Sequence, residues 1–166
     1  MSTVSYPVAT VRRAILSRTL IAGLVVGALD IAFAFALYVG IYEVTTPARV
    51  LQSIAAGLLG PADARAGGTP TALLGFFLHF VIAFGWAFAY TFVYRGSERL
   101  RRFVETSGRA AIAGFIAGMI VWLLMNRVVV PLSATTTLPL TSKFWLMQLI
   151  GHGFFVGLPL GLIIRE

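Results

Sequence analysis

Three ionisable side chains of this chain lie inside long apolar stretches: Asp30, His79 and His152. A titratable group within the hydrocarbon of a membrane is costly, so it normally faces other protein groups and marks a site or a packing contact. A helical rise of about 1.5 Å per residue puts Asp30 about 16 Å into its stretch and the histidines about 12 and 15 Å from the far surface. We therefore expect the three side chains in one layer of a helix bundle.

Several kinds of chemistry fit these residues. Asp30 follows Gly23 and Gly27 at helical spacing, so it shares their helix face and is expected to point into the bundle. There it could make a structural hydrogen bond to a neighbouring helix, or it could carry a proton. The two histidines could be packing residues, form a proton relay or a shared ligand site, or bind a b-type haem or a quinone between their helices.

Four further polar side chains are expected near this layer or at the outer edge of the bundle. Gln148 is one helical turn from His152 and lies on the same helix face. Asn126 and Arg127 are expected near the outer end of their helix. Glu43, at the outer end of another helix, could pair there with Arg127.

No motif of a known reaction accompanies these residues. The sequence has no Gly-rich phosphate loop, no zinc-ligand spacing and no serine nucleophile with a paired base and acid. The absence of cysteine excludes disulfides, thiolate metal sites and cysteine nucleophiles. Two histidines and one deep carboxylate are few ligands for a metal ion. We therefore expect no catalytic residue, no metal site, and a protein that is not an enzyme.

The elements that position these residues are four apolar segments, at about residues 20–42, 72–94, 110–130 and 142–164. Each reaches the roughly 20 residues that cross a hydrocarbon core about 30 Å thick, and in that medium such segments must be helical. Of the whole chain, 58% is apolar and only 11% is charged, whereas soluble domains carry about a quarter charged residues. The sequence therefore predicts an all-α membrane protein, a four-helix bundle forming one transmembrane domain over residues 1–166 in a lipid bilayer.

The loop between the first two spans has structure of its own. Thr46-Pro47 and Gly60-Pro61 are the start and stop signals of a helix at about residues 47–59. Apolar residues recur on one side of it and polar residues on the other: Val50, Leu51, Ile54, Ala55 and Leu58 against Arg49, Gln52 and Ser53. This pattern predicts a short amphipathic helix on the outer membrane surface or over the mouth of the bundle. Residues 62–68 are expected to form a flexible turn, and Thr69-Pro70 to cap the next helix.

Basic residues give the expected orientation. Nine of them lie before the first span, between the second and third spans, or after the fourth: Arg12, Arg13, Arg18, Arg95, Arg99, Arg101, Arg102, Arg109 and Arg165. The positive-inside rule then predicts a multi-pass protein of a bacterial inner membrane with both termini in the cytoplasm. The net charge of +7 is thus interpreted as a topology signal, with an anionic-lipid or RNA patch as the alternative. We expect no nucleic-acid partner.

The two halves of the sequence resemble each other. Ile21–Gly27 and Ile112–Gly118 each contain a Gly-x-x-x-Gly pair, and the second helix of each half carries one histidine. This indicates a parallel two-helix repeat about an axis along the membrane normal, and similar composition of glycine-rich helices is the alternative. Small residues let helix backbones approach closely in lipid. We therefore expect helix packing, within one chain or between chains, at Gly23, Gly27, Gly114, Gly118, Gly153, Gly157 and Gly161.

Four stretches of the second half, Gly114–Gly118, Val130–Leu132, Gly151–Gly153 and Ile163–Glu166, resemble the YagU-like group of small bacterial inner-membrane proteins. The first span and the segment at residues 47–60 look like uncharacterised four-helix membrane proteins of Gram-negative bacteria. The resemblance implies an inner-membrane location. It transfers neither an activity nor a catalytic residue.

Three functions are compatible with these features. The first is a non-enzymatic membrane protein without a cofactor that works by association, as an accessory subunit, a homo-oligomer or part of a larger membrane complex. The second is a small channel or transporter component in which Asp30, His79 and His152 line a path for protons or a small solute. The third is a subunit that binds haem b or a quinone, with His79 and His152 as the haem ligands.

Overall fold

The structure of the protein is a computed structural model that describes residues 8–135 and 144–165. Within these ranges every regular element is helical, and no strand occurs. In chain order the elements are α1 (Val8–Phe35), η1 (Ala36–Ile41), α2 (Pro47–Leu59), α3 (Pro61–Ala66), α4 (Gly68–Gly96), α5 (Glu98–Phe103), α6 (Ser107–Leu124), η2 (Met125–Val129), α7 (Trp145–His152), η3 (Gly153–Gly157) and α8 (Leu158–Ile164). The segments η1, η2 and η3 are π-helical turns that continue the helices before them.

Four of the helices are long and apolar enough to cross a membrane, as the sequence predicts. They cover Arg13–Ile41, Gly68–Gly96, Ser107–Val129 and Trp145–Ile164. The first two are 29 residues long, because α1 begins before residue 20 and α4 extends at both ends of the expected segment. The expected start of the fourth, at about residue 142, lies outside the described residues.

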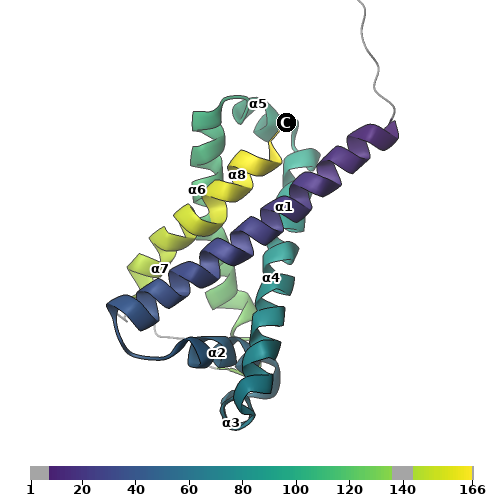
Figure 1. The fold of residues 1–166 in the computed structure, drawn as a ribbon. Helices are drawn as coiled ribbons and strands as arrows, with labels where there is room; N and C mark the ends of the chain where they lie inside the picture. Colours follow the sequence, from purple (N-terminus) through teal and green to yellow (C-terminus); the bar gives the residue numbers. More distant parts are fainter. Residues whose placement is uncertain (1–7, 136–143, 166) are drawn as a thin grey trace, which may run out of the picture.

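The spans form two hairpins that pack against each other (Figure 1). Helix α1 pairs with α4, α6 pairs with α7–η3–α8, and α1 also packs across η3 and α8. The start of α1, the end of α8 and the short helix α5 lie at one end of the bundle, which we call the Arg-rich end. Helices α2 and α3 lie at the opposite end, called the α2 end below.

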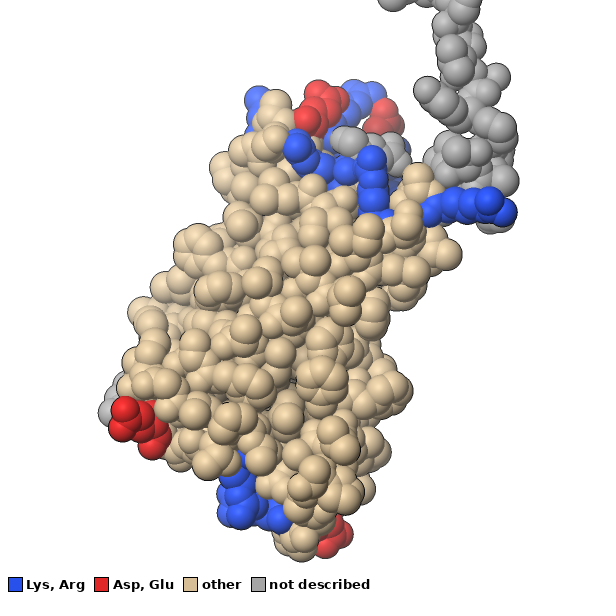
Figure 2. Space-filling model, in the orientation of Figure 1, with Lys and Arg blue, Asp and Glu red and all other residues tan. Residues whose placement is uncertain are grey.

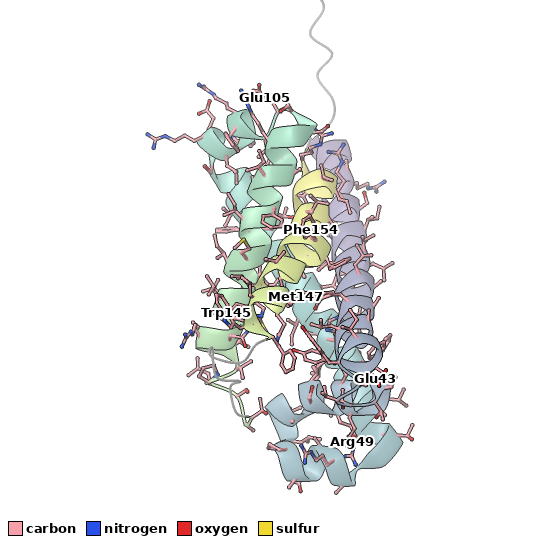
Figure 3. The ribbon with its side chains drawn as sticks, turned by 90° about the vertical axis from the view of Figure 1, so that its left-hand side faces the viewer. Glu43, Arg49, Glu105, Trp145, Met147 and Phe154 are labelled. Atoms are coloured by element: carbon pink, nitrogen blue, oxygen red, sulfur yellow. The ribbon has the colours of Figure 1, made fainter. Side chains whose placement is uncertain are left out.

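Charged and apolar side chains are separated along the bundle. Figure 2 shows Lys, Arg, Asp and Glu gathered at its two ends, with an uncharged band between them. Glu105 lies at the Arg-rich end, whereas Glu43 and Arg49 lie at the α2 end (Figure 3). Only 22% of the α4 and α6 spans is buried inside the molecule, and outward aromatic residues such as Phe92 are up to 80% exposed. Lipid is the medium that can cover so much apolar surface.

Glycines lie at the contacts between the spans. An added Cβ on Gly23 or Gly27 of α1 would overlap the rings of Phe84 and Phe80 of α4. In the second hairpin, glycines of α6 contact glycines of η3 and α8 directly: Gly114 and Gly118 against Gly157 and Gly161. Gly153 makes room for the ring of Phe115, and Gly151 for that of Phe33, which stacks on Phe155 at 4.8 Å and joins the hairpins.

The π-helical turns interrupt three of the four spans. Those of the first and third spans, η1 and η2, both lie at the α2 end of their helices. The third, η3, directly precedes Pro159 at the start of α8. Proline lacks the N–H that an α-helix requires, and a local change of helix type accommodates that loss. The apolar pattern of the fourth span does not predict this break.

The segment between the first two spans differs in part from the prediction. Residues 62–68 are not simply a turn, because Pro61–Ala66 form the helix α3 with Asp63 in its first turn and Arg65 in its last. Both charges suit the helix dipole. Thr69 does not cap α4, which begins at Gly68, whereas Pro70 lies in the first turn of the helix, the position expected for a first-turn proline.

Helix α2 forms where expected, with Thr46 accepting a hydrogen bond from the backbone N–H of Arg49 and Gly60 at φ 82° ending it. Its faces differ from the prediction at two positions. Gln52 is buried, because its side-chain amide donates to the carbonyl of Gly68, whereas Leu58 is 63% exposed. The helix lies across the α2 end of the bundle, against α4 (Figure 1).

Candidate functional site

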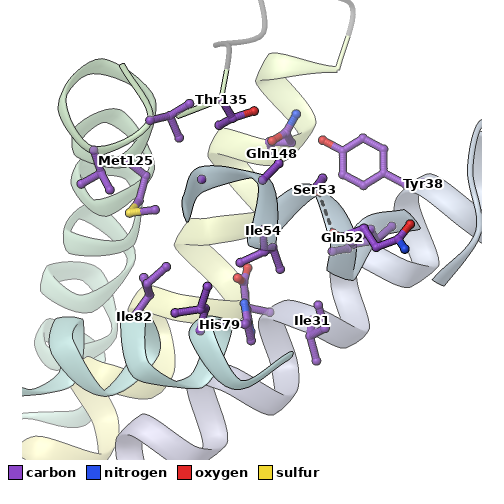
Figure 4. A pocket seen from close by; sticks show the side chains of 18 of the residues that line it. Ile31, Tyr38, Gln52, Ser53, Ile54, His79, Ile82, Met125, Thr135 and Gln148 are labelled. Carbon is purple, nitrogen blue, oxygen red and sulfur yellow. Dashed lines mark hydrogen bonds between the residues drawn. The ribbon is translucent and has the colours of Figure 1, made fainter. Parts of the chain in front are cut away.

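A cavity of about 1070 Å³ lies between the two hairpins, underneath α2. Its walls come from all four spans, namely α1 with η1, α4, α6 with η2, and α7 with η3, and its roof comes from α2 and α3. Figure 4 shows the side chains of Ile54, His79, Ile82 and Met125 around it, with α2 crossing above. The lining is mostly apolar, which is typical of small-molecule sites.

In the described residues, the exposed part of the cavity lining lies at the α2 end. It comprises Val44, Thr46, Arg49, Ser53, Leu58, Pro61, Arg65 and Val129. Towards the Arg-rich end, the two hairpins meet in a buried cluster that includes Ala22, Ala87 and Leu160, each 0% exposed. In the described part of the chain, the space between the helices is therefore a pocket and not a through-channel.

Five of the seven predicted polar candidates line this one cavity: Asp30, Asn126, Gln148, His79 and His152. Glu43 and Arg127 are outside it. No ion pair joins these two residues in the described ranges, although both belong to them. Glu43 follows the π-helical end of the first span at φ 51°, where the chain turns towards α2, and Arg127 is exposed on η2.

Asp30 and His152 approach each other across the hairpins. The Nε2 atom of His152 is 3.7 Å from Oδ1 of Asp30, and the two side chains are 19% and 22% exposed. The other ring nitrogen of His152, Nδ1, is 2.8 Å from the backbone oxygen of Gln148. A carbonyl oxygen only accepts, so Nδ1 carries a hydrogen and donates it. In the neutral ring, Nε2 therefore presents its lone pair to the carboxyl group.

His79 is held differently. Its Nε2 atom lies 2.9 Å from the backbone oxygen of Gly27 on α1, and it must be the donor of that bond. The side chain is only 9% exposed and meets the edge of the Phe80 ring. His79 therefore links α4 to α1, and its Nδ1 atom carries the lone pair when the ring is neutral.

This geometry differs from the one that two axial haem ligands need. Ligation uses the lone pair of a ring nitrogen while the other nitrogen donates to a second group. The available lone pairs are on Nδ1 of His79 and Nε2 of His152, and the latter faces a carboxyl group. Two histidine Nε2 atoms facing one iron would require His79 to leave Gly27. The residues do not fit a bis-histidine haem in this arrangement.

Three further polar side chains around the cavity, those of Trp122, Gln148 and Asn126, make hydrogen bonds to nearby groups. The indole N–H of Trp122 donates to the side-chain oxygen of Gln148 at 3.4 Å, and the amide of Asn126 donates to the backbone oxygen of Trp122 at 3.0 Å. Tyr38 of η1 extends into the cavity on the side of Gln148 (Figure 4). Tyr38 is a site residue that the sequence analysis missed, although it follows Asp30 by two four-residue helical intervals.

The roof of the cavity is tied to the spans on both sides. Gln52 donates to the carbonyl of Gly68, and the backbone of α2 at Leu51 is so close to Gly75 that a Cβ there would meet it at 1.9 Å. On the other side, the N–H of Ala134 donates to the carbonyl of Gly57 at 2.9 Å. Helix α2 is thus held against the spans on both sides of the cavity.

Comparison with known proteins adds no assignment: no protein-family model, no curated protein and no solved structure matches this chain. The resemblance to the YagU-like group therefore stays a prediction.

Proposed function

We propose that this chain is a non-enzymatic protein of a bacterial inner membrane that takes a small, largely apolar solute into the cavity from the α2 end, as a binding or transport component. The observation that carries the proposal is the cavity beneath α2, with apolar walls and the Asp30–His152 pair on its inner side. A site of this kind combines a large apolar contact area with a few polar groups that orient the ligand.

The orientation follows from the charges. Eight arginines with described side chains lie at the Arg-rich end: Arg13, Arg18, Arg95, Arg99, Arg101, Arg102, Arg109 and Arg165. The excess of positive charge favours the cytoplasm for that end and for both termini. The α2 end, and with it the mouth of the cavity, then faces outwards. Passage across the membrane would require the contact of Ala22, Ala87 and Leu160 to open.

We place solute binding before association because the glycines that suggested an oligomer pack within the chain. The small-residue positions that suggested an oligomer, such as Gly23, Gly118 and Gly161, all contact neighbouring helices of the same chain. They therefore supply no separate surface for a partner. A homo-oligomer or a larger complex would need another surface, such as the outward apolar faces of α4 or α6.

Binding of a neutral naphthylethanol probe to the protein in lipid nanodiscs tests the proposal, with empty nanodiscs as the reference for partitioning into lipid. Ala34 lines the cavity, whereas Ala32 on the same helix is exposed. Ala34→Phe should fill part of the cavity and weaken binding about tenfold, equivalent to about 1.4 kcal/mol, and Ala32→Phe should bind like the wild type. Absence of saturable binding to the wild type, or equal affinity of both variants, would contradict the proposal.

A further inference from the structure

We propose that the gap between Asp30 and His152 is an exchange site at which the ammonium group of an apolar amine displaces a proton. The inference rests on the proposed function, because it names the class of solute that the cavity takes. It is drawn from the two facing atoms, Oδ1 of Asp30 and Nε2 of His152, 3.7 Å apart on the cavity wall.

The two facing atoms are both acceptors when the pair holds no proton of its own. Nδ1 of His152 donates its hydrogen to the carbonyl oxygen of Gln148. In a neutral ring, Nε2 therefore has only a lone pair and can only accept. A carboxylate oxygen is also an acceptor, and 3.7 Å exceeds the usual N–H···O length of about 2.7–3.2 Å. One proton on either atom removes the mismatch and makes the pair neutral. The pair therefore has a neutral state and a state of charge −1.

An ammonium group can bind to the pair when the pair carries a charge of −1. It has three N–H donors, so it can donate to Oδ1 of Asp30 and to Nε2 of His152 at once, and its charge of +1 restores neutrality. The protonated pair plus R–NH₃⁺ gives the unprotonated pair with R–NH₃⁺ bound, and the released proton goes to water at the mouth. Neutrality matters here because an unpaired charge in apolar surroundings is costly. An alcohol lacks the charge, and an anion would add to that of Asp30.

The other ionisable groups around the cavity are less suited than Asp30 and His152 to bind the ammonium group. On α1 and η1 the neighbour is Tyr38, and on α4 it is His79, whose Nε2 atom is engaged by Gly27. The cavity wall from α6 and η2 has no ionisable side chain. Arg49 and Arg65 line the mouth and are exposed, so at physiological salt their repulsion of a cation is screened over about 8 Å.

Apolar side chains of the cavity wall can contact the apolar part of the ligand. The cavity wall contains Ile31, Ile82, Trp86, Val121 and Val156, which come from four different elements. These side chains can contact a hydrocarbon or aromatic group whose ammonium end reaches Asp30. The site therefore fits an amine with an apolar body better than a small inorganic cation.

Naphthylethylamine and naphthylethanol form a matched pair for the test, because they share their shape and differ in charge. Calorimetric titration in nanodiscs, in two buffers of different ionisation enthalpy, counts the protons released. We expect the amine to bind at least about tenfold tighter than the alcohol and to release up to one proton. The alcohol should release none.

The variant Asp30→Asn should lose the preference for the amine and the proton release while still binding the alcohol, which also shows that the cavity is intact. Asp63→Asn, an exposed acid at the α2 end, is the matched control and should behave like the wild type. Equal binding of amine and alcohol, or proton release that persists in Asp30→Asn, would overturn the inference while the proposed function stands. Absence of binding by both probes would overturn the proposed function and this inference with it.

Discussion

The two hairpins of the bundle use the same ingredients in different ways. In both, a Gly-x-x-x-Gly pair of the first helix faces the second helix near its histidine: Gly27 accepts the hydrogen bond of His79, and Gly118 lies against the backbone of His152. In the α1–α4 hairpin the glycines face flexible aromatic side chains. In the α6–α8 hairpin they face other glycines, so the backbones themselves touch.

This difference explains why the two histidines have different surroundings. The α1–α4 contact has space for the His79 ring. The Nε2 atom of this ring donates to the carbonyl of Gly27 and so links the two helices. Where α6 meets α7, the backbone of His152 lies against Gly118, whereas the His152 ring is on the cavity wall and donates to the carbonyl of Gln148 in its own helix. One histidine is thus structural, and the other is free to face Asp30. The internal repeat stays a prediction from the sequence.

Replacing glycines by alanine should give the largest difference between the hairpins. A Cβ at Gly118 would lie 2.1 Å from the carbonyl oxygen of His152, and the backbone has nowhere to move. At Gly23 the Cβ would meet the ring of Phe84, which can rotate. We expect Gly118→Ala to lower the free energy of unfolding by more than about 3 kcal/mol, above the usual overpacking cost, and Gly23→Ala to lower it by less. Unfolding in mixed micelles measures both.

Gly85 supplies the control for this series, because nothing lies within 4 Å of the Cβ it would gain. Gly85→Ala should be neutral or stabilising by up to about 1 kcal/mol, the helix-propensity gain of alanine over glycine. Equal stability of Gly118→Ala and Gly85→Ala would contradict the close backbone contact between the third and fourth spans.

Replacing each histidine by leucine should give a smaller and opposite pair of effects. His79→Leu removes a hydrogen bond between helices and should reduce stability by about 0.6 kcal/mol, with about 1.7 kcal/mol as an upper value for such bonds in membranes. It should leave amine-linked proton release unchanged. His152→Leu should keep the stability, since its Nδ1 bond is within its own helix, and should weaken amine binding, because the ammonium group loses its second acceptor. The comparison would be contradicted if, in the same unfolding and titration experiments, His152→Leu reduced the stability and His79→Leu changed the response to the amine.

The sequence predicts the four spans because their length and apolar composition leave helices as the one solution in lipid. The expected common layer is consistent with the 3.7 Å distance between Asp30 and His152. It could not give the different bonding of the two histidines, which depends on how closely each helix pair approaches. Glu43 follows the π-helical turn that ends the first span, and Arg127 lies inside the one that ends the third span; the sequence pattern does not predict these turns or the resulting positions of the two side chains.

The shape of the site is the part that sequence periodicity could least predict. The spacing in α2 indicates a helix, but its burial of Gln52 and exposure of Leu58 come from contacts with α4 that are distant in sequence. The role of Tyr38 depends on the same packing, because a side chain belongs to the cavity only when a neighbouring helix leaves room for it.

The most direct test of the account is the accessibility of the cavity to an impermeant thiol reagent. The chain has no cysteine, so Ala34→Cys places a single thiol on the cavity wall, Ala32→Cys places one on the exposed face of the same helix, and Glu105→Cys places one at the Arg-rich end. In intact spheroplasts we expect labelling of Ala34→Cys, protection of it by naphthylethylamine, little reaction of Ala32→Cys in lipid, and reaction of Glu105→Cys only after permeabilisation. Unreactive Ala34→Cys, or labelled Glu105→Cys in intact spheroplasts, would contradict a cavity that opens outwards at the α2 end.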